Sequence, residues 1–181
     1  KSIKIDDKIH QTFMAIKEKN EGNEFGAFLF SNEDDLYHIV AVVIPPQTVT
    51  GASMRYDGET YQNTVDKYAT GKIMKHGKRV LCVGTFHVHP IKGFSWTDEG
   101  DVKNMFGCNT SHGLPFVDIV YTSADEYEAR VILKQNIGKT KQFIKIGAEV
   151  ETFENDGEKI GIIGQVKNFL SGFSGWKINE K

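Results

Sequence analysis

Apolar residues recur along this chain with two periods, one typical of helices and one typical of strands. Ile9, Phe13 and Ile16 lie at i, i+4 and i+7, which predicts a first helix that Asp6 caps and Gly22 closes. Further helices are predicted from similar spacing or from their polar composition over three segments, 57–76, 97–106 and 160–173, the last with a stripe at Ile163, Val166, Phe169 and Leu170.

Five shorter segments are rich in β-branched and aromatic residues and predict strands. They are EFGAFLF (24–30), LYHIVAVVI (36–44), VLCVGTFHVH (80–89), PFVDIVYTS (115–123) and YEARVILK (127–134). The polar stretch SNEDD joins the first two and predicts a hairpin. Helices and strands mixed in this way predict an α/β (α+β) fold, a mixed, curved β-sheet flanked by helices.

Composition narrows the class of protein. The chain has 181 residues, 39% hydrophobic and 25% charged, values of an ordinary globular protein, so we expect one domain over 1–181 with a loose tail at 171–181. The net charge of −2 and the lack of a basic cluster argue against nucleic-acid binding. The longest apolar run, 39–44, is too short to span a membrane. Two cysteines, Cys82 and Cys108, suit reduced thiols and a cytoplasmic protein.

The segment GTFHVHPIKGFSWTDEGD (84–101) concentrates the residues that can carry chemistry. On a strand, His87 and His89 project to the same face, and we expect Thr85 and Val83 behind them. Two imidazoles and one carboxylate are the ligands of a catalytic zinc, and Asp98 follows after a short loop. The sequence therefore predicts a metal site on His87, His89 and Asp98.

Simpler interpretations of the same residues stay open at this point. Two histidines one residue apart also occur by chance, and Ser95 to Asp98 can be only a helix capping box. A phosphoesterase would use the histidines with more carboxylates, and Glu99 and Asp101 lie near Asp98.

The combination of His87-Val88-His89-Pro90 with Ser95-Trp96-Thr97-Asp98 and an upstream Glu24 resembles the motif of the JAMM/MPN+ zinc metalloproteases. The order of the predicted elements is similar to that of the family over roughly residues 3–133. Five residues separate His89 from Ser95, where the family commonly has about seven, which bears on substrate preference more than on the metal.

The resemblance implies a single MPN-type domain with one zinc ion per chain, held by His87, His89 and Asp98. It implies that Glu24 is the general base and that Ser95 donates a hydrogen bond to the oxyanion. The activity it implies is hydrolysis of the isopeptide or peptide bond after the C-terminus of ubiquitin or a ubiquitin-like protein. Processing of a sulfur-carrier precursor or another amide conjugate is the alternative substrate class, and a non-catalytic MPN scaffold the alternative role. An oligomer or an activating partner subunit is compatible with each.

Overall fold

The computed structural model describes residues 1–20, 22–45, 47–50, 53–56, 74–75, 78–89, 113–123, 125–153, 161–164 and 177–178. These residues form one helix, α1 (Asp7–Lys19), and twelve strands. The strands are β1 (Ser2–Asp6), β2 (Gly26–Asn32), β3 (Asp35–Ile44), β4 (Gln47–Thr50), β5 (Ser53–Tyr56), β6 (Met74–Lys75), β7 (Lys78–Val88), β8 (Phe116–Tyr121), β9 (Tyr127–Ile137), β10 (Thr140–Phe153), β11 (Gly161–Gly164) and β12 (Lys177–Ile178).

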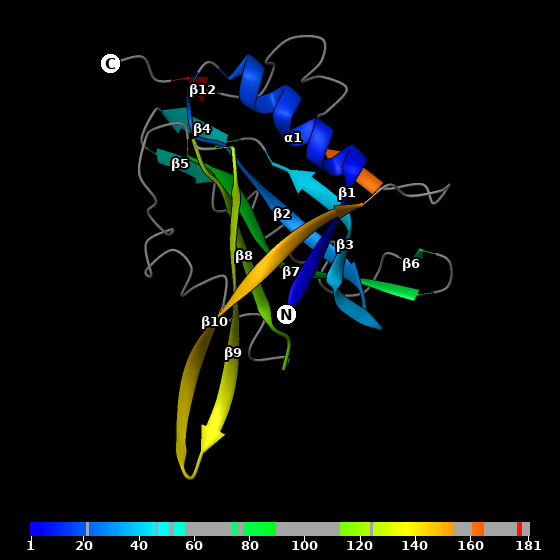
Figure 1. The fold of residues 1–181 in the computed structure, drawn as a ribbon, viewed down its shortest axis with the longest axis vertical. Coiled ribbons are helices and arrows are strands. Elements are labelled where there is room, and N and C mark those ends of the chain that lie inside the picture. Colours follow the sequence, from blue (N-terminus) through cyan, green and yellow to red (C-terminus); the bar gives the residue numbers. More distant parts are fainter. Residues whose placement is uncertain are drawn as a thin grey trace.

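Seven of the strands form a closed, mixed β-barrel in the order β1-β10-β9-β8-β7-β2-β3. The barrel closes because β1 pairs in parallel with β10 on one side and with β3 on the other, Lys4 lying opposite His38. Strand β11 extends the sheet along β3, and β12, β4 and β5 form a separate three-stranded sheet. Figure 1 shows α1 lying across one end of the barrel, close to the start of β2.

The expected curved sheet flanked by helices is therefore wrong, and the described part of the chain is mostly β. The expected fold lacks strands at residues 2–6 and 140–153, and these two segments close the barrel. The helix expected over 160–173 is wrong at its start, where Gly161–Gly164 is a strand paired with β3. The helices expected over 57–76 and 97–106 fall outside the described residues, apart from the short strand β6.

The predicted first helix and the five predicted strands are confirmed. Helix α1 begins after Asp6, whose side chain accepts a hydrogen bond of 2.8 Å from the Lys8 N–H, as expected for an N-cap. It ends at Lys19, three residues before Gly22, which has a φ of +84°. Strands β2 and β3 form the expected antiparallel hairpin.

The barrel interior is an apolar core that the buried face of α1 completes. The Phe13 ring of the helix stacks on Phe86 of β7, with ring centroids 3.8 Å apart and planes 3° from parallel. Six of the barrel strands supply buried residues to this core, and Ala148 and Val150 of β10 pack against it partly buried. The buried residues include Ile3, Ile5, Ile9, Ile16, Phe25, Leu29, Val42, Val83, Val88, Ile119 and Val131. Each such side chain contributes roughly 1.5–3 kcal/mol through burial.

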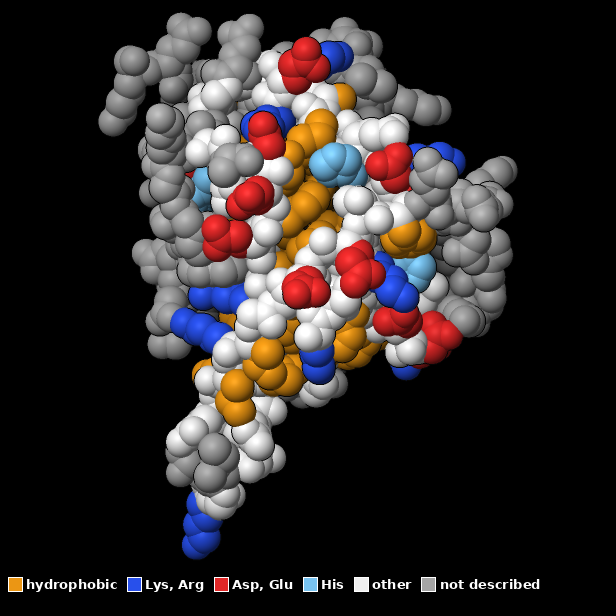
Figure 2. Space-filling view, viewed as in Figure 1, with side chains coloured by type: hydrophobic (Ala, Val, Ile, Leu, Met, Phe, Trp, Pro, Cys, Tyr) orange, Lys and Arg blue, Asp and Glu red, His pale blue; other side chains and the backbone are white. Residues whose placement is uncertain are grey.

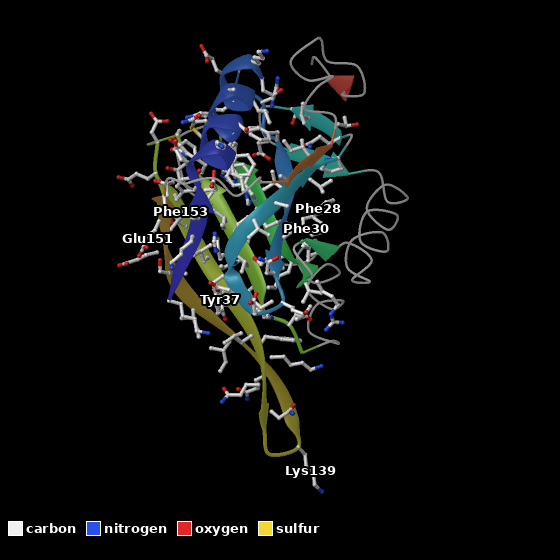
Figure 3. All side chains as sticks on the ribbon, turned by 90° about the vertical axis from the view of Figure 1, so that its right-hand side faces the viewer. Phe28, Phe30, Tyr37, Lys139, Glu151 and Phe153 are labelled. Atoms are coloured by element: carbon white, nitrogen blue, oxygen red, sulfur yellow. The ribbon has the colours of Figure 1, made fainter. Side chains whose placement is uncertain are left out.

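A second apolar cluster lies on the outer surface of the barrel. It consists of Phe28, Phe30, Val40, Ala41, Val43, Val80 and Cys82, all buried. Phe28 and Phe30 project from β2, as Figure 3 shows. Strands β2 and β7 are thus buried on both faces, which explains why their sequences are apolar or uncharged at almost every position.

The β9–β10 hairpin extends beyond the barrel and carries Lys139 at its tip (Figures 1 and 3). Gly138 takes a φ of +61° at the turn. On this hairpin Phe143 is 49% exposed. No helix among the described residues has the length and apolar character needed to cross a membrane.

Candidate metal centre

The two histidines of β7 and the residue after it lie side by side on the outer face of the barrel wall. His87 Nε2 and His89 Nε2 are 2.9 Å apart, and the ring centroids are separated by 4.8 Å. Both side chains are buried, with 3% and 7% of their surface exposed. The predicted side-by-side placement of this pair is confirmed.

The expected place of Val83 on the same face is wrong. The pairing of β2 with β7 shifts by one residue between Leu29 and Phe30, so that Gly84 lies opposite Leu29 while Cys82 lies opposite Phe30. Val83 is the extra residue of this bulge, and it packs in the barrel interior. Thr85 keeps the expected alternation with His87 and His89.

Burial keeps His87 in the neutral form that ligates metals. Desolvation, together with the smaller effects of the charges of His89 and Arg130, lowers the pKa of His87 from 6.5 to about 3. A neutral imidazole offers a lone pair to a metal at physiological pH without first losing a proton.

The histidine pair fits a zinc ion. Tetrahedral zinc with bonds of about 2.0–2.1 Å to nitrogen places two nitrogen ligands about 3.3 Å apart. The same nitrogen of both rings converges here, at a separation of 2.9 Å. A shift of a few tenths of an ångström would bring His87 and His89 to the spacing of two zinc ligands.

Glu24 lies two residues before the neighbouring strand β2, in line with the register of that strand against the histidine pair. Gly26 of β2 lies opposite His87, and the Val88 N–H donates a 2.9 Å hydrogen bond to the Phe25 carbonyl. Continuing this antiparallel register places Glu24 opposite His89, so that both side chains belong to the same outer face. Glu24 is buried, 8% exposed, and desolvation raises the pKa of its carboxyl to about 7.

Three neighbouring residues fix the backbone around Glu24. The Glu24 N–H donates to the Thr50 carbonyl at 2.8 Å, and Asn20 Nδ2 donates to the Glu24 carbonyl at 3.3 Å. The Gln47 side chain accepts from the Gly26 N–H at 2.8 Å and donates to the Gly26 carbonyl at 2.9 Å. Glu24 is therefore held by the end of α1 and by β4, although it precedes β2 by two residues.

Ser95 and Asp98 lie outside the described residues, so their predicted roles stay predictions. Within the described ranges, no three histidine, cysteine, aspartate or glutamate side chains gather into a metal-binding group. The structure brings together His87 and His89, and its strand register adds Glu24.

An ion pair on the same outer face was missed by the sequence analysis. Arg130 of β9 contacts Asp118 Oδ2 through Nε at 3.0 Å and through Nη2 at 2.9 Å. Asp118 is fully buried, and desolvation raises its pKa to about 6 against the opposing effect of Arg130. An aspartate in the middle of the apolar segment FVDIVY is the sequence signal that could have marked this position.

A separate open groove of about 710 Å³ lies where β1, β9 and β10 meet. It is lined by Lys1, Ser2, Tyr127, Glu128, Ala129, Gly147, Ala148 and Glu149. Figure 2 shows hydrophobic side chains in a hollow of this face, with acidic side chains around it. The lining includes neither histidine, so this groove is distinct from the candidate centre.

Comparison with known proteins adds no assignment: no protein-family model matches the chain, and no curated protein matches it.

Proposed function

We propose that this chain is a zinc-dependent peptidase that hydrolyses an isopeptide or peptide bond after the C-terminus of ubiquitin or a ubiquitin-like protein. The observation that carries the proposal is the convergence of His87 Nε2 and His89 Nε2 at 2.9 Å on a buried face that they share with Glu24. The resemblance of the motif residues to the JAMM/MPN+ metalloproteases supplies the reaction class.

Zinc, when bound, polarises the substrate carbonyl and lowers the pKa of a bound water toward about 7. His87 and His89 are two of its protein ligands in this proposal, and Asp98 is the third. Because the histidines are buried and His87 is neutral, their nitrogens are ready to bind a cation.

Glu24 is the general base. Its carboxyl has a pKa of about 7, so near neutral pH it can accept a proton from water and return it to the leaving amine. The hydrogen bonds from Glu24 N–H to Thr50 and from Asn20 to the Glu24 carbonyl hold its backbone still. A fixed base is what proton transfer over a short distance requires.

Ser95 completes the proposed machinery as the donor of a hydrogen bond to the developing oxyanion. A donor of this kind commonly contributes 10²- to 10³-fold in rate, about 2.7–4 kcal/mol. This role comes from the motif alone.

The substrate class rests on the motif and on the surroundings of Glu24. Strands β4 and β5 form an antiparallel hairpin, and the Thr50 carbonyl at the end of β4 accepts from the Glu24 N–H. This hairpin overlaps residues 48–61, the segment that the resemblance to the JAMM/MPN+ metalloproteases implies to contact the substrate. An extended C-terminal tail binding beside it would gain main-chain hydrogen bonds as an added strand. Sulfur-carrier precursors present the same kind of tail and are the alternative substrate.

A paired measurement of zinc content and cleavage tests the proposal. Purified protein supplied with zinc is incubated with a fusion of ubiquitin to a reporter through its C-terminal glycine, and with a sulfur-carrier fusion. The wild type is expected to cleave one of them, and Glu24→Gln to retain zinc but lose turnover, since Glu24 is not a ligand. Glu33→Gln removes an exposed carboxylate that pairs with Arg79 at 2.7 Å, and it is the control expected to change nothing. Normal turnover by Glu24→Gln, or a wild type that binds no zinc, would overturn the proposal.

A further inference from the structure

The buried ion pair between Asp118 and Arg130 lies next to the histidine pair on the outer face of the barrel, one row further along the strands. Asp118 is opposite Thr85 of β7 and opposite Arg130 of β9, so the three form one row across three strands. His87 is opposite Val120 in the next row on this face. The two rows are two residues apart along the strands, roughly 7 Å.

A contribution to folding stability does not explain well why the Asp118–Arg130 ion pair is buried here. Arg130 contacts Asp118 Oδ2 through Nε and Nη2, while the buried Oδ1 has no hydrogen-bond partner among the described residues. A buried ion pair generally adds little to stability compared with apolar residues of similar size, and one with an unsatisfied oxygen adds less. Its position next to the histidines calls for a different reason.

An electrostatic effect of the ion pair on the metal centre supplies such a reason. Arg130 lies on the same buried outer face as His87, in the neighbouring row of residues, so its positive charge acts on the histidine pair. The same charge would repel a divalent cation bound to His87 and His89. Water would screen this repulsion only weakly, because the surroundings are buried. The carboxylate of Asp118, in contact with the guanidinium, cancels this repulsion.

We propose that Asp118 is a positioning residue of the metal centre that neutralises Arg130 and so permits a cation to bind at His87 and His89. The inference rests on the proposed zinc-dependent function. It assigns to Asp118 a charge role and not that of a ligand, because no third histidine, cysteine, aspartate or glutamate side chain among the described residues gathers with His87 and His89.

Zinc affinity, measured by competition with a chelator of known affinity at pH 8, tests the proposal. Asp118→Asn keeps the shape but leaves the arginine charge uncompensated, and it is expected to bind zinc about 10- to 100-fold more weakly, as loss of an outer-shell partner commonly does. Arg130→Gln removes the repelling charge and is expected to bind zinc at least as tightly as the wild type. The double variant Asp118→Asn/Arg130→Gln is expected to return close to the wild-type affinity.

A purely structural role for the pair predicts a different pattern. Arg130→Gln would then weaken zinc binding as Asp118→Asn does, and the double variant would not recover; either result overturns the proposal. If Asp118→Asn shows no unfolding transition when heated in chelator, the other two variants still decide. Glu33→Gln, which breaks the exposed pair with Arg79 at the far end of β7, is the control expected to keep wild-type affinity.

The outcome for the wild type separates this inference from the proposed function. A wild type that binds zinc, with Asp118→Asn binding it equally well, overturns the charge role and leaves the peptidase proposal standing. A wild type without zinc affinity overturns both.

Discussion

The inner face of β7 and the outer face of its C-terminal half are buried to a similar degree but are built from opposite chemistry. Inside the barrel, Phe86 and Val88 are fully buried in an apolar core. Outside it, Thr85, His87 and His89 are 4%, 3% and 7% exposed, and Asp118 and Arg130 lie beside them. Burying polar groups costs free energy that apolar side chains would not lose, so the outer face is built for something other than stability.

The difference predicts that substitutions on the two faces of β7 separate stability from function. Phe86→Ala removes the ring that stacks on Phe13 and should lower the free energy of unfolding by about 3–5 kcal/mol. His87→Ala, one residue away, should cost far less stability in metal-free protein and abolish zinc binding. Urea unfolding in chelator, with zinc content measured on the same samples, checks both. Equal losses of stability for the two variants would contradict the contrast.

Gly84 of β7 lies where the backbones of β7 and β8 approach each other closely. A Cβ at Gly84 would lie 1.7 Å from the Val117 carbonyl oxygen, so any side chain there forces the strands apart. Gly84→Ala should therefore destabilise the protein by about 1–3 kcal/mol or more through overpacking.

Gly147→Ala of β10 is the matched control for Gly84→Ala. Its Cβ would meet nothing within 4 Å, and thermal unfolding should show little change. A Gly84→Ala variant as stable as Gly147→Ala would contradict this prediction, because it would show that β7 and β8 can move apart at little cost in free energy.

The smallest predicted effect is the pH dependence that Glu24 gives to stability. Burial raises the pKa of Glu24 from 4.5 to about 7, so between these pH values the folded protein holds a proton that the unfolded chain releases. The contribution of Glu24 to stability is therefore greatest below about pH 4.5 and falls as pH rises through 7. Glu24→Gln should be more stable than the wild type by about 1–3 kcal/mol at pH 8 in metal-free protein, the upper value being that of the full shift, and should differ little near pH 4.5. If the free energies of unfolding of the two proteins changed with pH in the same way, ionisation of Glu24 would not contribute to stability and the prediction would be wrong.

The sequence predicts the local elements better than it predicts how they close. The apolar spacing of Ile9, Phe13 and Ile16 and the five strand segments have local periods, and the structure confirms them. β10 also alternates, with Ile144, Ile146 and Val150 between polar residues, so its strand is readable from the sequence although it is not among the five predicted strands. Closure of the barrel depends on β1 pairing with β10 and β3, and no local pattern states which strands meet.

The candidate site divides in the same way. The i, i+2 spacing was enough to place His87 and His89 together, because both lie on one strand. The bulge opposite Phe30 moved Val83 to the interior, which alternation alone misses. Asp118 and Arg130 meet only through the register of β8 with β9, a contact between residues twelve positions apart along the chain that residue types do not reveal.

The most direct test of the account is the zinc content of the purified protein, measured by elemental mass spectrometry beside His87→Ala and Glu33→Gln. The account predicts close to one zinc per chain in the wild type and in Glu33→Gln, and almost none in His87→Ala. A wild type without zinc after incubation with the metal, or His87→Ala with the same zinc content as the wild type, would contradict the claim that the outer face of β7 is a metal centre.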